Sequence, residues 1–166
     1  MKYFSGFCLD KEEALFKPYL IQSDFTVAGF SYGAIKACEY AFTCKERIDT
    51  LQLFSPAFFE DRDAKFKKLQ TLSFAKNTQA YCGNFLNALA CPGIEAYFKQ
   101  GSLEELETLL HYRWEREKLQ ALKQKGVHIE VYLGEQDAII HALTCKDFFL
   151  PFATVYYLKN VGHTLT

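Results

Sequence analysis

Ser31 lies at the centre of a G-x-S-x-G sequence, a spacing that is typical of a serine acting as a nucleophile. The preceding residues 24–28 are largely apolar, aromatic or β-branched, as in a strand, whereas residues 34–44 are rich in alanine and contain no proline or glycine, as in a helix. We therefore expect the chain to turn sharply from a strand into a helix at Ser31. Gly29 and Gly33 suit such a turn, because a Cβ at either position would meet the neighbouring strand or helix.

A serine hydroxyl is a poor nucleophile at neutral pH, so Ser31 needs a base to take its proton and an acid to orient that base. Asp137 follows the strand-like segment 127–133, and His163 follows the strand-like segment 154–158. The order of serine, acid and histidine, with the last two on loops at the carboxyl ends of later strands, is that of a strand–elbow–helix architecture. The sequence therefore predicts a catalytic triad of Ser31, His163 and Asp137.

Two of these roles have competing residues. Glu135 lies slightly earlier in the same loop as Asp137 and is the alternative acid, in which case Asp137 is an ordinary turn aspartate. His141 is the one substitute for the base. His111 and His128 are expected to be structural or solvated.

The tetrahedral intermediate of acyl transfer carries an oxyanion, which two backbone N–H groups should stabilise. Tyr32 follows the nucleophile at the positive end of a helix and is expected to supply one of them. The other should come from the loop 5–9 after the first strand. Phe7 is the first choice, because Gly6 lets the backbone turn close to the substrate, and Cys8 is the second.

The whole chain has 166 residues, of which 49% are hydrophobic, and a net charge of −1. These values suit one globular domain and give no whole-surface attraction to nucleic acid or anionic membrane, so we expect neither as a partner. No apolar stretch approaches the roughly 18 to 20 residues that span a bilayer, and no export signal is recognisable, so we expect a cytoplasmic location. The six cysteines include no C-x-x-C pair. We therefore expect reduced packing cysteines, no metal and no cofactor; three disulfides would require export.

Hydrophobic periodicity gives the order of the elements. Strands are predicted at 1–4, 24–28, 48–54, 127–133 and 154–158, and helices from Asp10 to about Pro18, at 34–44, at 144–149 and repeatedly between about 57 and 125. This order indicates an α/β fold with about five mainly parallel strands, one domain over residues 1–166, and a helical insertion after the third strand.

Local signals mark several helix ends. Asp10 with Glu13, and Ser102 with Glu105, have the spacing of helix-start capping residues. Gly126 is placed where a glycine would end the helical stretch that begins near Ser102.

In chain order, Ser5-Gly6-Phe7, the elbow around Ser31, Gly134-Glu135-Gln136-Asp137 and Val161-Gly162-His163 resemble the motifs of the α/β-hydrolase superfamily. The chain looks most like the BioV-type pimeloyl-[acyl-carrier protein] methyl ester esterases, in the run Val27 to Ala34 and in its short length. This resemblance implies that a methyl ester of pimeloyl-carrier protein is hydrolysed to methanol and a free carboxylate in biotin biosynthesis. It also implies that the insertion is a cap over the active site.

The chain departs from the superfamily pattern in two respects. It begins at the strand that usually comes third and passes from the first helix directly to the nucleophile strand, which leaves few helices; we expect the helical insertion, or a second subunit as in a homodimer, to cover one face of the sheet. Ser5-Gly6 also stands where His-Gly is frequent, which leaves the geometry of the oxyanion loop open.

On the resemblance, the cap binds the acyl chain and the acidic carrier protein. The apolar side chains of the cap either line an acyl tunnel or form plain core; they are Phe58, Phe59, Phe66, Leu69, Leu72, Phe74, Tyr81, Phe85, Leu86 and Leu89. The candidate docking cations are Arg62, Lys65, Lys67, Lys68, Arg113, Arg116 and Lys118. The alternative for each cation is a solvated helix face with acidic neighbours.

The leading hypothesis is a serine carboxylesterase in which His163 deprotonates Ser31 and Ser31 attacks the ester carbonyl. A thioesterase or a broad short-chain esterase would use the same triad. A non-catalytic acyl-binding or partner-binding module with the same fold is the alternative from a different class.

Overall fold

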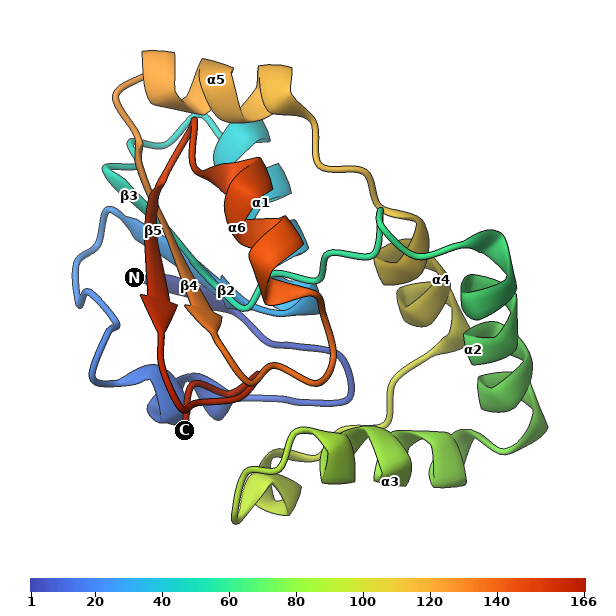
Figure 1. Cartoon of the computed structure of the whole chain (residues 1–166). Coiled ribbons are helices and arrows are strands. Elements are labelled where there is room, and N and C mark those ends of the chain that lie inside the picture. The colour runs from blue at the N-terminus through green and yellow to red at the C-terminus, as the bar shows by residue number, and fades with distance from the viewer.

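A computed structural model describes all residues, 1–166, and contains one five-stranded sheet (Figure 1). The strands are β1 (Lys2–Phe4), β2 (Thr26–Phe30), β3 (Thr50–Phe54), β4 (His128–Gly134) and β5 (Thr154–Leu158). All four strand pairs are parallel, and the strands lie in the sheet in chain order. The predicted α/β class with five parallel strands is confirmed, and the carboxyl ends of the strands share one edge of the sheet.

The helical elements follow the predicted order. They are η1 (Glu12–Phe16), α1 (Tyr32–Thr43), α2 (Ala64–Lys76), α3 (Thr78–Ala88), η2 (Ile94–Tyr97), α4 (Leu103–His111), α5 (Arg116–Gln124) and α6 (Ala142–Phe149), where η marks a 3₁₀ helix. None of them is long and apolar enough to cross a membrane.

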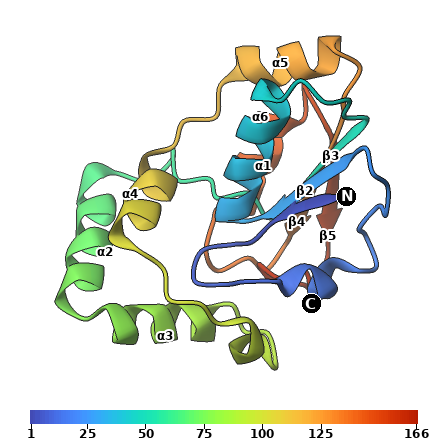
Figure 2. The same cartoon turned by 180° about the vertical axis from the view of Figure 1, so that it is seen from behind.

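Alternate residues of the central strands face opposite sides of the sheet. Leu51, Leu53 and Val131 are fully buried in one hydrophobic cluster together with residues of α1, α5 and α6. Phe54 and Tyr132 belong to a second cluster on the opposite face. The three crossover helices therefore cover only one side of the sheet, as both views show (Figure 2).

The other face is covered by the β1–β2 connection, residues 5–25. Phe16 of η1 is fully buried there, with its ring centroid 4.9 Å from that of Phe30 and 4.6 Å from that of Phe54. The helical insertion covers the sheet only in part, as α5 packs with α1 and α6 and as Leu86, Leu89 and Ile94 join the cluster around Phe16. The nearly helix-free β1–β2 connection supplies the aromatic packing on this face. The β1–β2 and β2–β3 connections step the same way across the sheet but cross opposite faces. The two crossover connections therefore have opposite handedness, which is unusual because crossovers between parallel strands are nearly always right-handed.

The predicted helix start at Asp10 and Glu13 is wrong. The chain forms the short η1 instead, with Lys11 in the left-handed region (φ 61°) before it and no side-chain cap. The reason is Glu12, whose buried carboxylate accepts a 2.8 Å hydrogen bond from the amide of Gly6 and so fixes this turn against the loop after β1.

The signals at the other helix ends are confirmed. Ser102 and Glu105 form a reciprocal capping box, and Gly126 has a φ of 85° where the helical stretch ends. That stretch is broken between α4 and α5, where the indole N–H of Trp114 donates to the carbonyl of Ala57 at 3.0 Å. Trp114 is thereby buried beneath the entry to the insertion.

The helices of the insertion occupy two places. In both views α2, α3 and α4 lie beside the sheet and apart from α1 and α6, whereas α5 lies with α1 and α6 (Figures 1 and 2). The separate group still shares the main hydrophobic cluster, through Phe74 of α2 and Leu109 of α4. A backbone bridge between Leu9 and Phe98 joins it to the loop after β1.

Candidate active site

Ser31 occupies the turn between β2 and α1 in a strained conformation. Its φ and ψ are 52° and −113°, outside the regions that non-glycine residues usually occupy, at a cost on the order of 1–3 kcal/mol. Two backbone hydrogen bonds oppose this strain: the Ser31 amide donates to the Phe54 carbonyl at 2.9 Å, and the Ala57 amide donates to the Ser31 carbonyl at 3.1 Å. The serine is thus fixed between the carboxyl end of β3 and the first helical turn of α1.

The two glycines of the elbow are required by close backbone approach. A Cβ on Gly29 would lie 2.2 Å from the carbonyl oxygen of Gly33, and a Cβ on Gly33 would lie 1.9 Å from that of Phe4. Backbone cannot yield as a flexible side chain can. The strand, the turn and the loop after β1 therefore pack in this way only because both positions lack a side chain.

His163 and Asp137 form a buried pair at the same edge of the sheet. The Nδ1 of His163 lies 2.7 Å from Oδ2 of Asp137, and neither side chain is exposed. The other carboxylate oxygen of Asp137 accepts hydrogen bonds from the amides of Ile139 at 2.8 Å and Ile140 at 3.0 Å. Both acceptor oxygens are therefore fixed, and the imidazole can have only a narrow range of orientations.

The environment of Asp137 favours its charged form. Burial by itself would raise the pKa of this carboxyl, but the charge and hydrogen bond of His163, with the amides of Ile140 and Ile139, hold the pKa below its ordinary value. Asp137 is thus a carboxylate at neutral pH. A carboxylate in this position orients the imidazole and stabilises its protonated form.

The acid loop and the histidine loop are joined through their backbones. The amide of Glu135 donates to Leu158 at 2.8 Å, and that of Gln136 donates to Val161 at 2.9 Å. A Cβ on Gly134 would lie 2.1 Å from the carbonyl oxygen of Gly162. The approach of the two loops therefore depends on a glycine at the end of β4.

Ser55 is a positioning residue that the sequence did not reveal. Its hydroxyl donates a 2.6 Å hydrogen bond to the backbone carbonyl of His163, and it is fully buried. In the sequence, Ser55 before Pro56 signals only the end of a strand. Residues 54 and 55 thus hold Ser31 and His163 respectively, which brings the two residues to the same point of the sheet edge.

The Nε2 atom of His163 is buried and has no hydrogen-bond partner in the protein. An unpartnered buried nitrogen costs about 1–3 kcal/mol, so it marks a place where a partner is expected to bind or move. The hydroxyl of Ser31 forms no hydrogen bond with it in this state. Such bonds between base and nucleophile are often long without substrate and shorten when substrate binds.

The alternative acid and base lie elsewhere. Glu135 is exposed, and its carboxylate accepts a 3.4 Å hydrogen bond from the amide of Asn160. His141 is half exposed and pairs with Asp61 at 2.6 Å. His111 is exposed at the end of α4, and His128 lies at the amino end of β4, opposite the site.

The two expected oxyanion donors are available. The amides of Phe7 and Tyr32 donate to no oxygen of the protein, and Tyr32 is the first residue of α1. Phe7 lines the same cavity as Ser31, whereas Cys8 lines a different one and points its sulfur at Cys82, 3.0 Å away. The arrangement favours Phe7 over Cys8.

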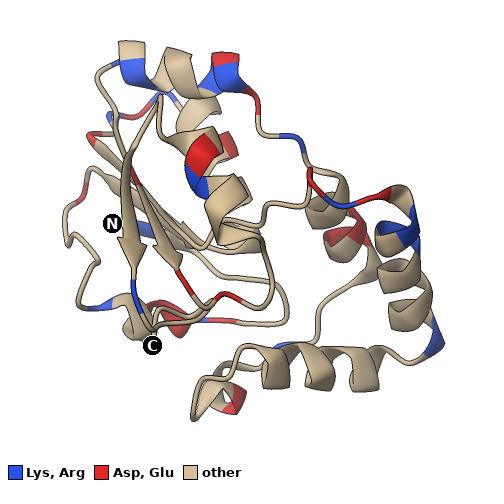
Figure 3. Cartoon of the chain, in the orientation of Figure 1, with Lys and Arg blue, Asp and Glu red and all other residues tan.

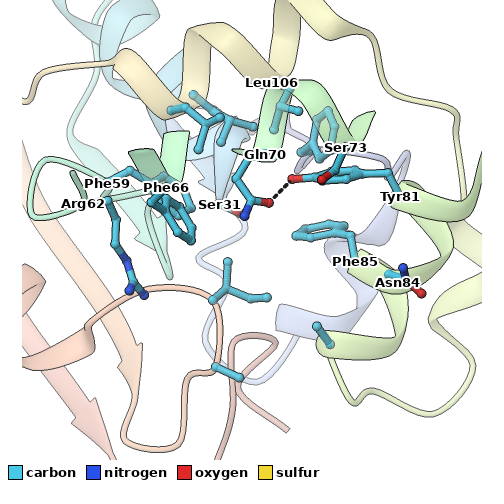
Figure 4. A pocket seen from close by; sticks show the side chains of 16 residues that line it. Ser31, Phe59, Arg62, Phe66, Gln70, Ser73, Tyr81, Asn84, Phe85 and Leu106 are labelled. Carbon is cyan, nitrogen blue, oxygen red and sulfur yellow. Dashed lines mark hydrogen bonds between the residues drawn. The ribbon is translucent and has the colours of Figure 1, made fainter. Parts of the chain in front are cut away.

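A cavity of about 420 Å³ opens beside Ser31 between the sheet edge and α2, α3 and α4 (Figure 4). Its apolar lining includes Phe7, Phe59, Phe66, Tyr81, Phe85, Leu106, Leu109, Leu110 and Ile139. Its polar lining includes Arg62, Gln70, Ser73 and Asn84, and a 2.7 Å hydrogen bond joins Tyr81 to Gln70 within it. The cavity suits an acyl chain that also carries polar groups.

The predicted apolar cap residues fall into three groups. Phe59, Phe66, Tyr81 and Phe85 line the cavity; Phe58, Phe74, Leu86 and Leu89 are buried away from it; and Leu69 and Leu72 are exposed. The leucines of α4 that line the cavity were not among the predicted liners.

Lys and Arg residues lie along α2 and α5 (Figure 3), and the predicted docking cations differ in their contacts. Lys65, Lys68 and Arg113 are exposed and form no salt bridge. Arg116 lies 4.8 Å from the centre of the Phe148 ring. Lys118 is mostly buried and pairs with Glu39 at 2.6 Å.

Lys67 is half-buried on α2, whereas Arg62 lies in the cavity wall. The exposed cations on α2 and near α5 are thus available to a partner, whereas Lys118 is engaged within the chain.

A parallel sheet in this order, an elbow serine after β2, and acid and histidine loops after β4 and β5 define the α/β-hydrolase fold. Comparison with solved structures agrees. E-2-(acetamidomethylene)succinate hydrolase aligns with a TM-score of 0.61 at 12% identity, covering 98% of this chain and 84% of that one. BioG from Haemophilus influenzae aligns with a TM-score of 0.59 at 14% identity, covering 98% and 87%.

A carboxylesterase of the thaumarchaeon Nitrososphaera gargenis aligns with a TM-score of 0.60 at 16% identity, covering 83% of this chain but only 57% of that one. This chain thus spans little more than half the length of that esterase. No family model and no curated protein sequence matches the chain. At these identities the comparisons show the fold alone.

Proposed function

We propose that this protein is a serine hydrolase of carboxylic esters, with Ser31 as nucleophile, His163 as base and Asp137 as the residue that orients and stabilises the base. The observation that carries the proposal is the buried His163–Asp137 pair, 2.7 Å apart, whose free Nε2 lies at the same sheet edge as the strained elbow serine. A purely structural histidine would have its second nitrogen hydrogen-bonded or solvated.

In the proposed reaction, Nε2 of His163 takes the proton of Ser31 as the serine oxygen attacks the ester carbonyl carbon. The amides of Phe7 and Tyr32 stabilise the oxyanion, and the protonated imidazole gives its proton to the departing alcohol. Water, deprotonated by the same nitrogen, then attacks the acyl-enzyme. The acid is released, and Ser31 regains its proton.

The substrate that we propose is the methyl ester of pimeloyl-carrier protein, which yields methanol and free pimeloyl-carrier protein in biotin biosynthesis. Three features support this choice: the sequence resemblance to the BioV-type esterases, the fold shared with BioG, and an apolar cavity of about 420 Å³ beside Ser31. A cytoplasmic location belongs to the same proposal, because carrier-bound acyl chains are made there.

The carrier protein is proposed to dock on the cap. Lys65 and Lys68 are free cations on α2, which borders the cavity; Arg113 lies between α4 and α5, and Arg116 is the first residue of α5. Cations near the entrance of a cavity attract an acidic partner and increase its rate of association, and the effect weakens with salt.

The test is mass spectrometry of methyl pimeloyl-carrier protein after incubation with wild-type protein and with Ser31→Ala. The proposal predicts conversion to the free acid, with the thioester intact, by wild type only. Cleavage of the thioester alone would indicate a thioesterase on the same triad. No reaction of either bond, in a folded protein, would favour a non-catalytic binding module.

A further inference from the structure

Arg62 lies on the wall of the cavity that contains Ser31, in the loop between β3 and α2 (Figure 4). Its guanidinium carbon lies 4.9 Å from the centre of the Phe66 ring, and its Nε is buried without a hydrogen-bond partner. It forms no salt bridge with any carboxylate of the chain. A partly desolvated cation is thus held in the cavity with no counter-charge.

The acidic residues around Arg62 are all engaged elsewhere. Glu60 accepts the amide of Trp114 at 2.7 Å, and Asp61 pairs with His141 at 2.6 Å. Asp63 caps α2 by accepting the amide of Phe66 at 2.7 Å. Three carboxylates next to Arg62 in sequence therefore leave it free, although a salt bridge with any of them would be the simplest local arrangement.

Removing a charge from water without a partner is unfavourable, so the natural counter-charge for Arg62 is one that arrives with a ligand. Guanidinium is planar and offers parallel N–H donors that match a carboxylate or a phosphate. The side chains of Ser73 and Asn84 line the same cavity and form no hydrogen bonds within the protein. In Figure 4 they lie across the cavity from Arg62, which is therefore the one cation among the side chains that line it.

We propose that Arg62 is an anion-binding specificity residue, so that the preferred substrate is an ester whose acyl portion carries a carboxylate or phosphate oxyanion some distance from the reacting carbonyl. The apolar lining holds the chain, Ser31 attacks one end, and Arg62 pairs with the anion. This proposal rests on the proposed function, because it takes Ser31 as the reacting group. It differs from carrier docking in placing the charge of Arg62 inside the cavity.

The test compares a neutral ester, p-nitrophenyl hexanoate, with the mono-p-nitrophenyl ester of adipic acid, which has the same chain length and a terminal carboxylate. Arg62→Gln should raise KM for the anionic ester about tenfold or more, with kcat and the neutral ester nearly unchanged, since a charge-assisted contact is lost. Arg62→Lys should restore part of the affinity. Lys76→Gln is the matched control, because it removes an exposed cation in the last turn of α2 and should change neither KM.

A second experiment tests whether the anion that Arg62 binds is a phosphate. Hydrolysis of the neutral ester is measured with 4′-phosphopantetheine or pantetheine as inhibitor. If the anion is a phosphate, Arg62→Gln weakens inhibition by the phosphorylated compound about tenfold and leaves that of pantetheine unchanged. An effect on either anionic probe supports the proposal. Equal behaviour of wild type and Arg62→Gln on both overturns it, whereas esterase activity that survives in Ser31→Ala overturns the proposed function instead.

Discussion

The hydroxyl of Ser55 donates a 2.6 Å hydrogen bond to the backbone carbonyl of His163, a residue 108 positions later in the chain. One position earlier, the carbonyl of Phe54 accepts the amide of Ser31 at 2.9 Å. The end of β3 therefore holds both the proposed nucleophile and the proposed base. Their relative position depends on a strand that contributes no reacting group.

Replacing Ser55 tests this positioning role. Ser55→Ala removes the anchor of the histidine loop and is expected to lower kcat for a neutral ester up to about tenfold, the effect of one net hydrogen bond of typical strength, while KM changes little. Ser73→Ala is the control, since Ser73 lines the cavity and forms no side-chain hydrogen bond. Unchanged kcat in Ser55→Ala would show that the histidine loop is held by its other contacts alone.

Two variants in the loop after β4 test which residue is the acid that orients His163. Asp137→Asn should lower kcat roughly 10³- to 10⁴-fold, because an amide favours the wrong imidazole tautomer and does not stabilise the imidazolium. Glu135→Gln should stay close to wild type, because Glu135 is exposed and contacts only the amide of Asn160. The reverse result, a large loss in Glu135→Gln, would make Glu135 the acid.

The lowered pKa of Asp137 predicts a pH-dependent contribution to stability. A carboxyl whose pKa is lower in the folded than in the unfolded state adds stability above its unfolded pKa, near 4, and loses it as pH falls through the folded value. The difference in Tm between wild type and Asp137→Asn should therefore be largest at neutral pH and shrink below about pH 4. Thermal unfolding followed by circular dichroism measures it. A difference independent of pH would contradict the assigned charge.

Glu12 is predicted to position the oxyanion loop. Its buried carboxylate accepts the amide of Gly6 at 2.8 Å and the hydroxyl of Tyr3 at 3.1 Å. Glu12→Ala should lower kcat by up to about 10²-fold, the lower end of the effect of losing one oxyanion donor, through displacement of Phe7. Glu12→Gln keeps an acceptor and should recover most of this loss, and Glu13→Ala should have little effect. Full activity in a folded Glu12→Ala would exclude the role.

The sequence predicted those parts of the site that depend on the order of strands and on short-range turns. Parallel strands place their carboxyl ends at one edge, so the loops of Ser31, Asp137 and His163 could be brought together from strand order alone. Gly29 and Gly33 were recognisable because a sharp elbow leaves no space for a Cβ.

Other features could not be read from the sequence, because they depend on which way a helix or loop turns in three dimensions. Leu69 and Leu72 have helical spacing but are 52% and 56% exposed, whereas Leu106 from another helix lines the cavity. Glu12 and Ser55 act through hydrogen bonds with residues that the folded chain brings near. Periodicity identifies a buried face but does not distinguish core from cavity wall.

The central claim is that Ser31 is an activated nucleophile, and covalent labelling by a fluorophosphonate tests it most directly. Peptide mass spectrometry is predicted to locate the phosphonyl group on Ser31 in wild type, with greatly slowed labelling in His163→Ala and none in Ser31→Ala. Circular dichroism would establish that both variants are folded. Absence of label in the folded wild-type protein, or equal labelling of the wild type and the Ser31→Ala variant, would contradict this claim.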